Sequence, residues 1–177
     1  MRIIAGEWRG RSLIAPEGKA TRPTADRTRE ALFSMLASRV GSFEGLRVAD
    51  VCAGTGALGL EALSRGAAHC TFVERDRAAV DALKANIAKI GADAEAKAEV
   101  RAIAAESFTG GSYDLVLIDP PYGTGLAQKI LPKIGVAPGG WVSIETAKGE
   151  AVTVPGFESV VERVHGKAML TLLRAEA

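Results

Sequence analysis

Apolar residues along the chain fall into two alternating patterns. Short continuous runs, such as 113–118, predict strands that are buried on both faces, as in a parallel sheet. Between these runs, apolar residues recur every three or four positions, as in 77–90, which predicts helices with one buried face. Strands and helices that alternate in this way favour an α/β fold with a mostly parallel sheet.

The pattern assigns an element to most of the chain. It predicts helices over 24–40, 60–66, 77–90 and 126–131, and strands over 46–52, 69–73, 99–104, 113–118, 141–145, 159–165 and 167–173. The last two strands flank Gly166 and are predicted to pair as an antiparallel hairpin. Proline and glycine content predicts a loop over 16–23.

An N-terminal extension precedes this series. Residues 2–5 and 12–14 predict two short strands around a glycine-bounded turn, and this hairpin would carry Trp8, Arg9 and Arg11. An exposed tryptophan between arginines would suit stacking on RNA. A buried tryptophan would instead fasten the hairpin to the core, which is the more frequent fate of this residue.

Composition narrows the class of protein. A chain of 177 residues with 47% hydrophobic and 24% charged residues is typical of one soluble globular domain. No apolar run is long enough to span a membrane and no signal-peptide core is present, so we expect a cytoplasmic protein. Cys52 and Cys70 lack metal-ligand or disulfide-framework spacing, so we expect no metal.

Charge is concentrated near the N-terminus. Residues 1–30 carry seven basic and four acidic side chains, a net charge of +3, whereas the whole chain carries +1. Most of the basic residues are arginines, which bind phosphates through two hydrogen bonds and stack on bases. The segment therefore indicates either a nucleic-acid contact or a solvated basic face.

A glycine-rich turn follows the strand predicted over 46–52. Gly54, Gly56 and Gly59 match G-x-G-x-x-G, and Glu74 lies at the distance of a ribose-binding carboxylate. Alone, this fingerprint is that of an NAD-dependent oxidoreductase. Asp50 favours S-adenosylmethionine instead, because a carboxylate near the loop would repel a pyrophosphate but would reach the ammonium group of a methionyl moiety.

Asp119-Pro120-Pro121-Tyr122 stands at the end of the predicted strand over 113–118. Ligands bind at the carboxyl edge of open α/β sheets, and the two prolines end the strand because neither donates a hydrogen bond. The Asp119 carboxylate and a proline carbonyl can hold the two hydrogens of an amino group, and the Tyr122 ring can stack on a base. A strand-ending turn with a buried tyrosine is the alternative structural interpretation.

The four residues 119–122 resemble the (Asp/Asn)-Pro-Pro-(Tyr/Phe) motif of methyltransferases that modify exocyclic amines of nucleobases. Segments 2–11 and 22–30, the glycine loop and this motif occur in the order found in bacterial 16S rRNA guanine-N2 methyltransferases of the RsmD type. The resemblance covers essentially the whole chain. It implies a Rossmann-like class I methyltransferase with a seven-stranded, mostly parallel sheet that ends in an antiparallel hairpin.

The resemblance also implies a function and a division of the chain. We expect S-adenosylmethionine-dependent methylation of guanine N2 in 16S rRNA, within the small ribosomal subunit or an assembly intermediate, by a monomer without membrane contact. Residues 1–177 would form one domain, in which 1–44 are an RNA-docking extension and 45–177 the catalytic core.

The resemblance assigns the expected site residues to three groups. The catalytic residues are Asp119, Pro120, Pro121 and Tyr122. The cofactor-binding residues are Asp50, Ala53, Gly54, Thr55, Gly56, Glu74, Arg75, Glu106 and Asp119. The RNA-binding residues are Trp8, Arg9, Arg11, Arg22, Thr24 and Arg27. One departure concerns the adenine contact: Ala104-Ala105 stand where many such enzymes have an acidic residue, which leaves Glu106 or a backbone carbonyl for this contact.

Other functions remain open on sequence alone. The same chemistry on an adenine or cytosine amine in DNA, or on another RNA, fits the motif equally. A catalytically silent RNA-binding assembly factor would keep the fold, although intact Asp50, Asp119 and Tyr122 argue against it.

Overall fold

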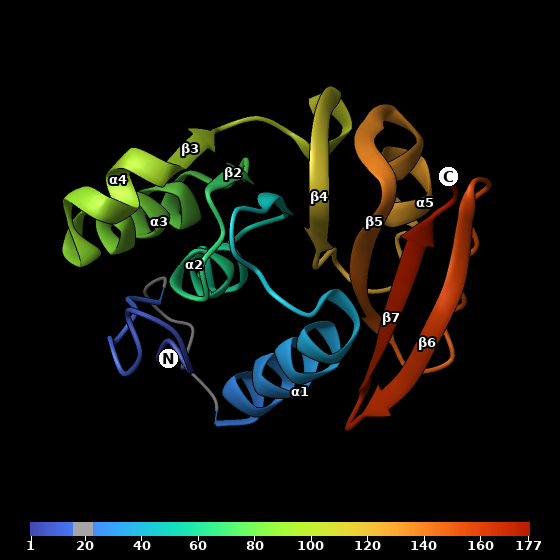
Figure 1. Cartoon of the computed structure of the whole chain (residues 1–177), viewed down its shortest axis with the longest axis horizontal. Helices are drawn as coiled ribbons and strands as arrows, with labels where there is room; N and C mark the ends of the chain where they lie inside the picture. Colours follow the sequence, from blue (N-terminus) through green and yellow to red (C-terminus); the bar gives the residue numbers. More distant parts are fainter. Residues whose placement is uncertain (16–22) are drawn as a thin grey trace.

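The computed structural model describes residues 1–15 and 23–177. Its centre is a seven-stranded sheet in the order β3-β2-β1-β4-β5-β7-β6 (Figure 1). The strands are β1 (Arg47–Val51), β2 (His69–Val73), β3 (Ala98–Arg101), β4 (Gly110–Ile118), β5 (Ile134–Ala147), β6 (Phe157–His165) and β7 (Ala168–Ala175). Neighbouring strands from β3 to β5 are parallel, and β7 is antiparallel to both β5 and β6. This confirms the predicted sheet with its terminal hairpin.

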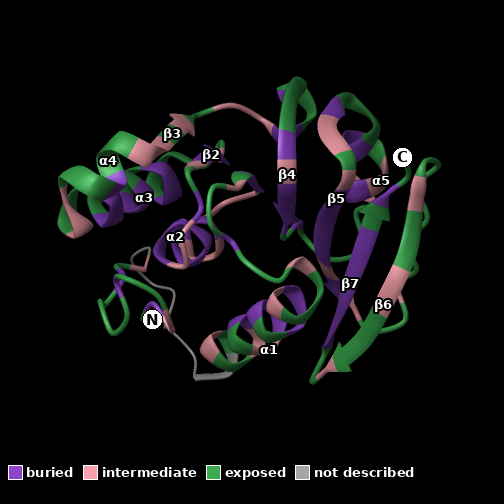
Figure 2. Cartoon of the chain, viewed as in Figure 1, coloured by how far each residue is buried: buried purple, intermediate pink, exposed green. Residues whose placement is uncertain are grey.

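Helices pack on both faces of the sheet. They are α1 (Pro23–Val40), α2 (Ala57–Ser64), α3 (Arg77–Ile90), α4 (Ala92–Lys97) and α5 (Leu126–Ile130), with short 3-10 helices η1 (Ala105–Ser107) and η2 (Leu131–Lys133). Because side chains alternate along a strand, Val48 of β1 joins the hydrophobic cluster under α1, α2 and α3, whereas Ala49 and Val51 join the cluster under α5. Buried residues follow the central strands (Figure 2). No helix among the described residues has the length and apolarity to cross a membrane.

The structure departs from the predicted elements in several places. β4 and β5 begin at Gly110 and Ile134, earlier than predicted, because these glycine-containing segments pair with each other. The short helix α4 was not predicted, since its six residues are too few for a clear repeat. β3 ends at Arg101 rather than at 104.

The register of the sheet gathers four chain segments at one edge. Val51 of β1 pairs with Val73 of β2 and with Ile118 of β4, and Ile118 pairs with Ile144 of β5. The residues that follow Val51, Val73 and Ile118 therefore leave the sheet together, as the glycine loop, the Glu74 turn and the Asp119 motif. They lie beside the end of β5, whose last residues remain paired with β7.

The N-terminal segment forms one antiparallel bridge, between Arg2 and Ser12, instead of two strands. The backbone amides of Ile4 and Ala5 donate to the Glu61 carboxylate at 2.9 and 3.0 Å. They are therefore not used for pairing across the hairpin. Trp8 is only 6% exposed and belongs to the same hydrophobic cluster as α1 and α2. The expectation that Trp8 contacts RNA is therefore wrong for this conformation, because the ring is in the core.

Four charged residues join this segment to the helices, and we refer to Asp26, Arg29, Glu61 and Arg65 as the Glu61 cluster. Glu61 is fully buried, and its carboxylate lies 2.9 Å from Arg65 Nε and 3.6 Å from Arg29 Nε. Arg29 also donates to the Arg2 carbonyl and pairs with Asp26 at 3.1 Å. The positive charge near the start of α1 is thus partly neutralised inside the protein.

Gly6 allows the segment to lie directly against α2. Its backbone has a φ of +90°, and a Cβ built there would be 2.0 Å from the Ser64 carbonyl oxygen. The Ser64 hydroxyl donates to the Ala5 carbonyl at 2.7 Å and accepts from the Trp8 amide at 3.0 Å. Close backbone contact, rather than strand pairing, therefore holds the extension.

Candidate active site

Glu74 is hydrogen-bonded to the glycine loop. The Gly54 amide donates to Glu74 Oε1 at 2.9 Å, and the Asp76 amide donates to Glu74 Oε2 at 2.8 Å. The Thr55 carbonyl accepts from Asn86 Nδ2 at 3.0 Å, which ties the loop to α3. The end of β2 therefore holds the loop from one side and α3 holds it from the other.

The three glycines of the loop serve different purposes. Gly54 has a φ of +57° and lines a pocket, and a Cβ on it would meet no atom within 4 Å. A Cβ on Gly56 would lie 2.3 Å from Leu83 Cδ1, and one on Gly59 would lie 2.3 Å from the Phe72 ring. Gly54 thus leaves room for a ligand, whereas Gly56, predicted to approach the cofactor, is required for core packing.

Asp50 does not point openly into the pocket. It is 1% exposed, its Oδ2 accepts from the Gly59 amide at 2.9 Å, and its Oδ1 is buried without a hydrogen-bond partner among the described residues. Burial, reinforced by the Asp119 and Glu74 carboxylates, raises the pKa of Asp50 to about 8. Asp50 therefore fixes the junction of loop and helix, and one of its oxygens is left for a donor.

Cys52 adopts a φ of +63°, a conformation that is uncommon outside glycine. It lies between Asp50 and the loop, where backbone strain of this kind often accompanies a binding site. Burial and the surrounding carboxylates, Glu74 first among them, raise the pKa of the Cys52 thiol to about 12. The thiol is therefore protonated at neutral pH and is not a nucleophile.

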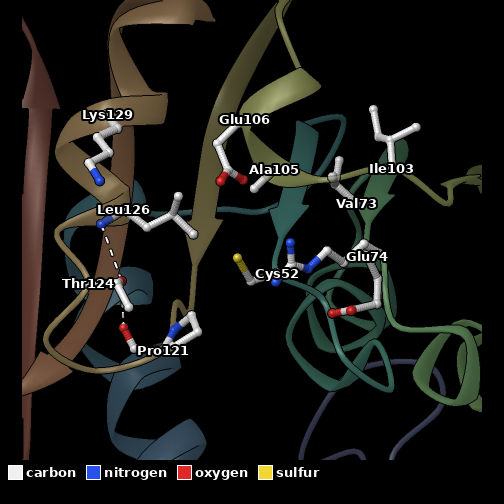
Figure 3. Close-up of a pocket in the computed structure, with 11 residues that line it drawn as sticks. Cys52, Val73, Glu74, Ile103, Ala105, Glu106, Pro121, Thr124, Leu126 and Lys129 are labelled. Carbon is white, nitrogen blue, oxygen red and sulfur yellow. Dashed lines mark hydrogen bonds between the residues drawn. The ribbon is translucent and has the colours of Figure 1, made fainter.

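Two adjoining pockets open at this sheet edge, and Cys52 and Glu74 line both of them. The smaller, of about 270 Å³, has apolar walls from Val73, Ile103 and Leu126 (Figure 3). Figure 3 also shows the Glu106 carboxylate directed toward this space. Arg75, one of the expected cofactor-binding residues, lines the same pocket.

The larger pocket, of about 860 Å³, is lined by residues of the glycine loop, by Asp119 and by Tyr122. The Asp119 amide donates to the Val51 carbonyl at 3.4 Å, so the motif begins where β1 and β4 separate. The Tyr122 side chain is 48% exposed and its hydroxyl donates to Glu145 Oε2 at 2.8 Å. The predicted alternative of a buried tyrosine is therefore excluded.

The loop after Asp119 is fixed by side chains that the sequence did not indicate. The Thr124 hydroxyl donates to the Pro121 carbonyl at 2.8 Å. Glu150 accepts from the Gly123 and Ala147 amides at 3.2 and 3.1 Å. Pro120 is buried, while Pro121 lines the smaller pocket.

The environment of Asp119 favours the protonated, neutral carboxyl group more than water does. The residue is exposed on the side of the larger pocket, while the protein around it partly removes water from its carboxyl group. This desolvation, with the nearby Glu145 carboxylate, raises the pKa of Asp119 to about 7. Desolvation and the hydrogen bond to Glu145 also raise the pKa of Tyr122, so its phenol remains a donor.

Another part of the wall of the larger pocket comes from α1 and from the tip of the β6–β7 hairpin. Thr28 Oγ1 and His165 Nδ1 are 3.2 Å apart, which joins the two elements, and Lys167 also lines the pocket. Sequence reasoning did not select His165 or Lys167, although two basic side chains that flank Gly166 are a signal for a cationic hairpin tip.

The expected RNA-binding residues that the structure describes belong to the N-terminal segment and to α1. Arg9 and Arg11 are exposed, and Arg11 Nη1 donates to the Lys89 carbonyl at 3.5 Å. Arg27 is exposed on α1. Arg22 and the side chain of Thr24 lie outside the described residues.

Comparison with known proteins identifies the family. The family model described as Conserved hypothetical protein 95 matches residues 1–174. Ribosomal RNA small subunit methyltransferase D of Escherichia coli is 36% identical over 185 residues, which cover 100% of this chain and 91% of that protein. The chain belongs to the ribosomal RNA small subunit methyltransferase D family.

Further relatives agree with this family. A putative rRNA methyltransferase of Bacillus subtilis, YlbH, is 40% identical over 126 residues, which cover 69% of this chain and 67% of that protein. The solved structure of the putative methyltransferase yhhF from Escherichia coli has a TM-score of 0.86 and 37% identity, and the alignment covers 100% of this chain and 98% of that one. The predicted family and class I methyltransferase fold are thereby confirmed.

In this member of the methyltransferase D family, η1 supplies two residues to the smaller pocket. Ala104-Ala105 replace the expected acidic position after β3, and Ala105 and Glu106 both line the pocket from η1. A carboxylate is therefore still supplied to this space, one residue later along the chain.

Proposed function

We propose that the protein transfers the methyl group of S-adenosylmethionine to the exocyclic N2 amine of a guanine in 16S rRNA. Relatives named as small-subunit rRNA methyltransferases and a methyltransferase fold over the whole chain support S-adenosylmethionine-dependent rRNA methylation. The proposal of guanine N2 as the target rests on one observation: Asp119, the exposed Tyr122 and the glycine loop line the same pocket.

The two pockets fit the parts of the cofactor. Glu74 is placed to hold ribose hydroxyls, and the apolar walls of the smaller pocket with Glu106 suit an adenine ring and its amine. The open space at Gly54 and the unpartnered Asp50 Oδ1 suit the methionyl end, whose ammonium group is a donor. When bound, the cofactor supplies an electrophilic methyl group on a sulfonium.

The residues around Asp119 prepare the amine. Guanine N2 is a poor nucleophile because its lone pair is delocalised into the ring, so alignment is the main contribution of the enzyme. Asp119 and the Pro120 carbonyl accept the two N2 hydrogens, since the Pro121 carbonyl is already bonded to Thr124. Tyr122 stacks on a base turned out of the RNA. Methyl transfer would form the new N–C bond, break the C–S bond of the sulfonium to leave a neutral thioether, and release a proton that Asp119, with a pKa of about 7, would take.

The proposal is tested by methyl transfer with product identification. Protein and cofactor labelled in the methyl group are incubated with small ribosomal subunits, naked 16S rRNA or DNA, and the nucleic acid is digested to nucleosides. Labelled N2-methylguanosine from the subunit or the rRNA is expected. Label in N6-methyladenosine or N4-methylcytosine, or binding of NAD without binding of S-adenosylmethionine, would contradict the proposal.

RNA docking is proposed for the exposed arginines of the N-terminal segment. Replacing Arg9 and Arg11 by alanine should weaken rRNA binding and flatten its salt dependence, by about 0.7–0.9 in log–log slope for each phosphate that is no longer neutralised. Cofactor affinity should remain unchanged. The matched control is the double alanine variant of Arg39 and Lys133, which removes the same charge at exposed positions elsewhere. An equal effect of both variants would mean that only net charge matters.

A further inference from the structure

Glu145 stands beside Asp119 at the carboxyl edge of the sheet. Ile118 of β4 and Ile144 of β5 are partners in a parallel register, and both side chains face the cluster under α5. The next residues, Asp119 and Glu145, are therefore neighbours whose side chains leave the sheet on the opposite face. Both line the larger pocket.

The Glu145 carboxylate is held by one oxygen only. The Tyr122 hydroxyl donates to Oε2 at 2.8 Å, and within the described part of the chain the structure gives Oε1 no hydrogen-bond donor. An ionised carboxylate can only accept hydrogen bonds. The influence of Glu145 on the pKa of Asp119 agrees with their proximity. The pocket therefore presents two acceptor groups side by side.

Two adjacent acceptors match one nucleobase amine better than the others. In guanine, the amine at C2 lies next to N1–H, so two neighbouring positions of the Watson–Crick edge donate. In adenine and cytosine, the amine lies next to an unprotonated ring nitrogen, which is an acceptor. A second carboxylate beside the amine site therefore attracts guanine and repels adenine and cytosine.

We propose that Glu145 determines specificity for guanine by accepting a hydrogen bond from N1–H while Asp119 and the Pro120 carbonyl hold N2. The Tyr122 hydroxyl orients Glu145 for this contact. The same tyrosine thus stacks on the base and positions the carboxylate that recognises it. This inference rests on the proposed function and adds to it a reason why guanine is selected over adenine and cytosine.

2-Aminopurine provides the test, because it keeps the amine at C2 but has an unprotonated N1. The guanine mapped as the methylation site is replaced by 2-aminopurine through ligation of a synthetic oligonucleotide into 16S rRNA, and single-turnover methylation of both RNAs is measured in reconstituted subunits. The wild-type protein should prefer guanine by about tenfold to a hundredfold. In Glu145→Gln, the amide can donate to N1 of 2-aminopurine, so this ratio should fall at least about tenfold.

Glu150→Gln is the matched control, since Glu150 is a neighbouring carboxylate that only fixes the motif loop. It should lower both rates by the same factor and leave the ratio unchanged. If Glu145→Gln also lowers both rates equally, Glu145 has a structural role and the inference is wrong. A wild-type protein that leaves the guanine unmethylated would instead refute the proposed function, and the inference with it.

Discussion

Replacing Asp119 by alanine is expected to lower the methyl-transfer rate by about 10²–10³-fold, the typical cost of one preorganised group at a reacting centre. The fold and cofactor affinity should be nearly unchanged. The backbone at Asp119 is fixed by β4 and Pro120, and the side chain faces an open pocket, so its removal costs little packing. Single-turnover kinetics and calorimetry of cofactor binding measure the two quantities separately. A wild-type rate in this variant would mean that residues 119–122 are only a structural turn.

Asp119→Asn separates orientation from proton transfer. Its amide oxygen can still accept from N2–H, so substantial activity would show that Asp119 acts by orienting the amine. Because the pKa of Asp119 is raised to about 7, the wild-type rate should increase with pH up to about neutrality, as the carboxylate forms. Asparagine does not titrate, so this limb should disappear in the variant. Equal inactivity of the Asn and Ala variants, with cofactor still bound, would show that charge is required.

Replacing Glu61 by alanine is expected to reduce the free energy of unfolding by about 3–5 kcal/mol, the usual effect of removing one partner of a buried ion pair. Arg29, which is 4% exposed, would lose one of its two carboxylate partners, and the amides of Ile4 and Ala5 would lose their acceptor. Chemical denaturation measures the loss. The control Glu30→Ala, at an exposed position of α1, should change stability by less than about 0.5 kcal/mol.

A loss below about 1 kcal/mol in Glu61→Ala, well under the usual effect for a buried ion pair, would show that the cluster is not what holds the N-terminal segment. In that event the contacts of Ser64 with Ala5, Glu7 and Trp8 would be the main attachment. A stability loss in Ser64→Ala clearly larger than that in Glu61→Ala would support this second explanation.

Much of the fold was predictable because its signals are local. β2 and α3 have the predicted limits, since their apolar patterns are uninterrupted. The early part of β5 was not predictable, because glycines and a proline conceal a strand that forms only through pairing with β4. Likewise, nothing local distinguishes an exposed Trp8 from a buried one.

The part of the site that is formed by recognisable sequence motifs was predictable. The glycine loop, Glu74 and Asp119 meet at one edge because parallel strands end together, which sequence order alone indicates. Glu145 was missed because it stands 26 positions after Asp119, and only the register of β4 with β5 makes them neighbours. Glu61 was missed because a carboxylate in a short helix is expected in solvent, and its partners other than Arg65 come from distant segments.

The unequal roles of Gly54, Gly56 and Gly59 explain why the loop motif alone could not separate two chemistries. Two of its three glycines, Gly56 and Gly59, are needed because α2 and α3 pack closely against β2. Any nucleotide-binding α/β protein of this topology has the same steric requirement. The motif therefore indicates close packing of a helix on a strand more directly than it indicates a particular ligand. Side chains outside the glycines distinguish the two ligands instead, above all carboxylates such as Asp50 and Glu74, which accept hydrogen bonds from backbone amides of the loop and its helix and also offer acceptor groups to a ligand.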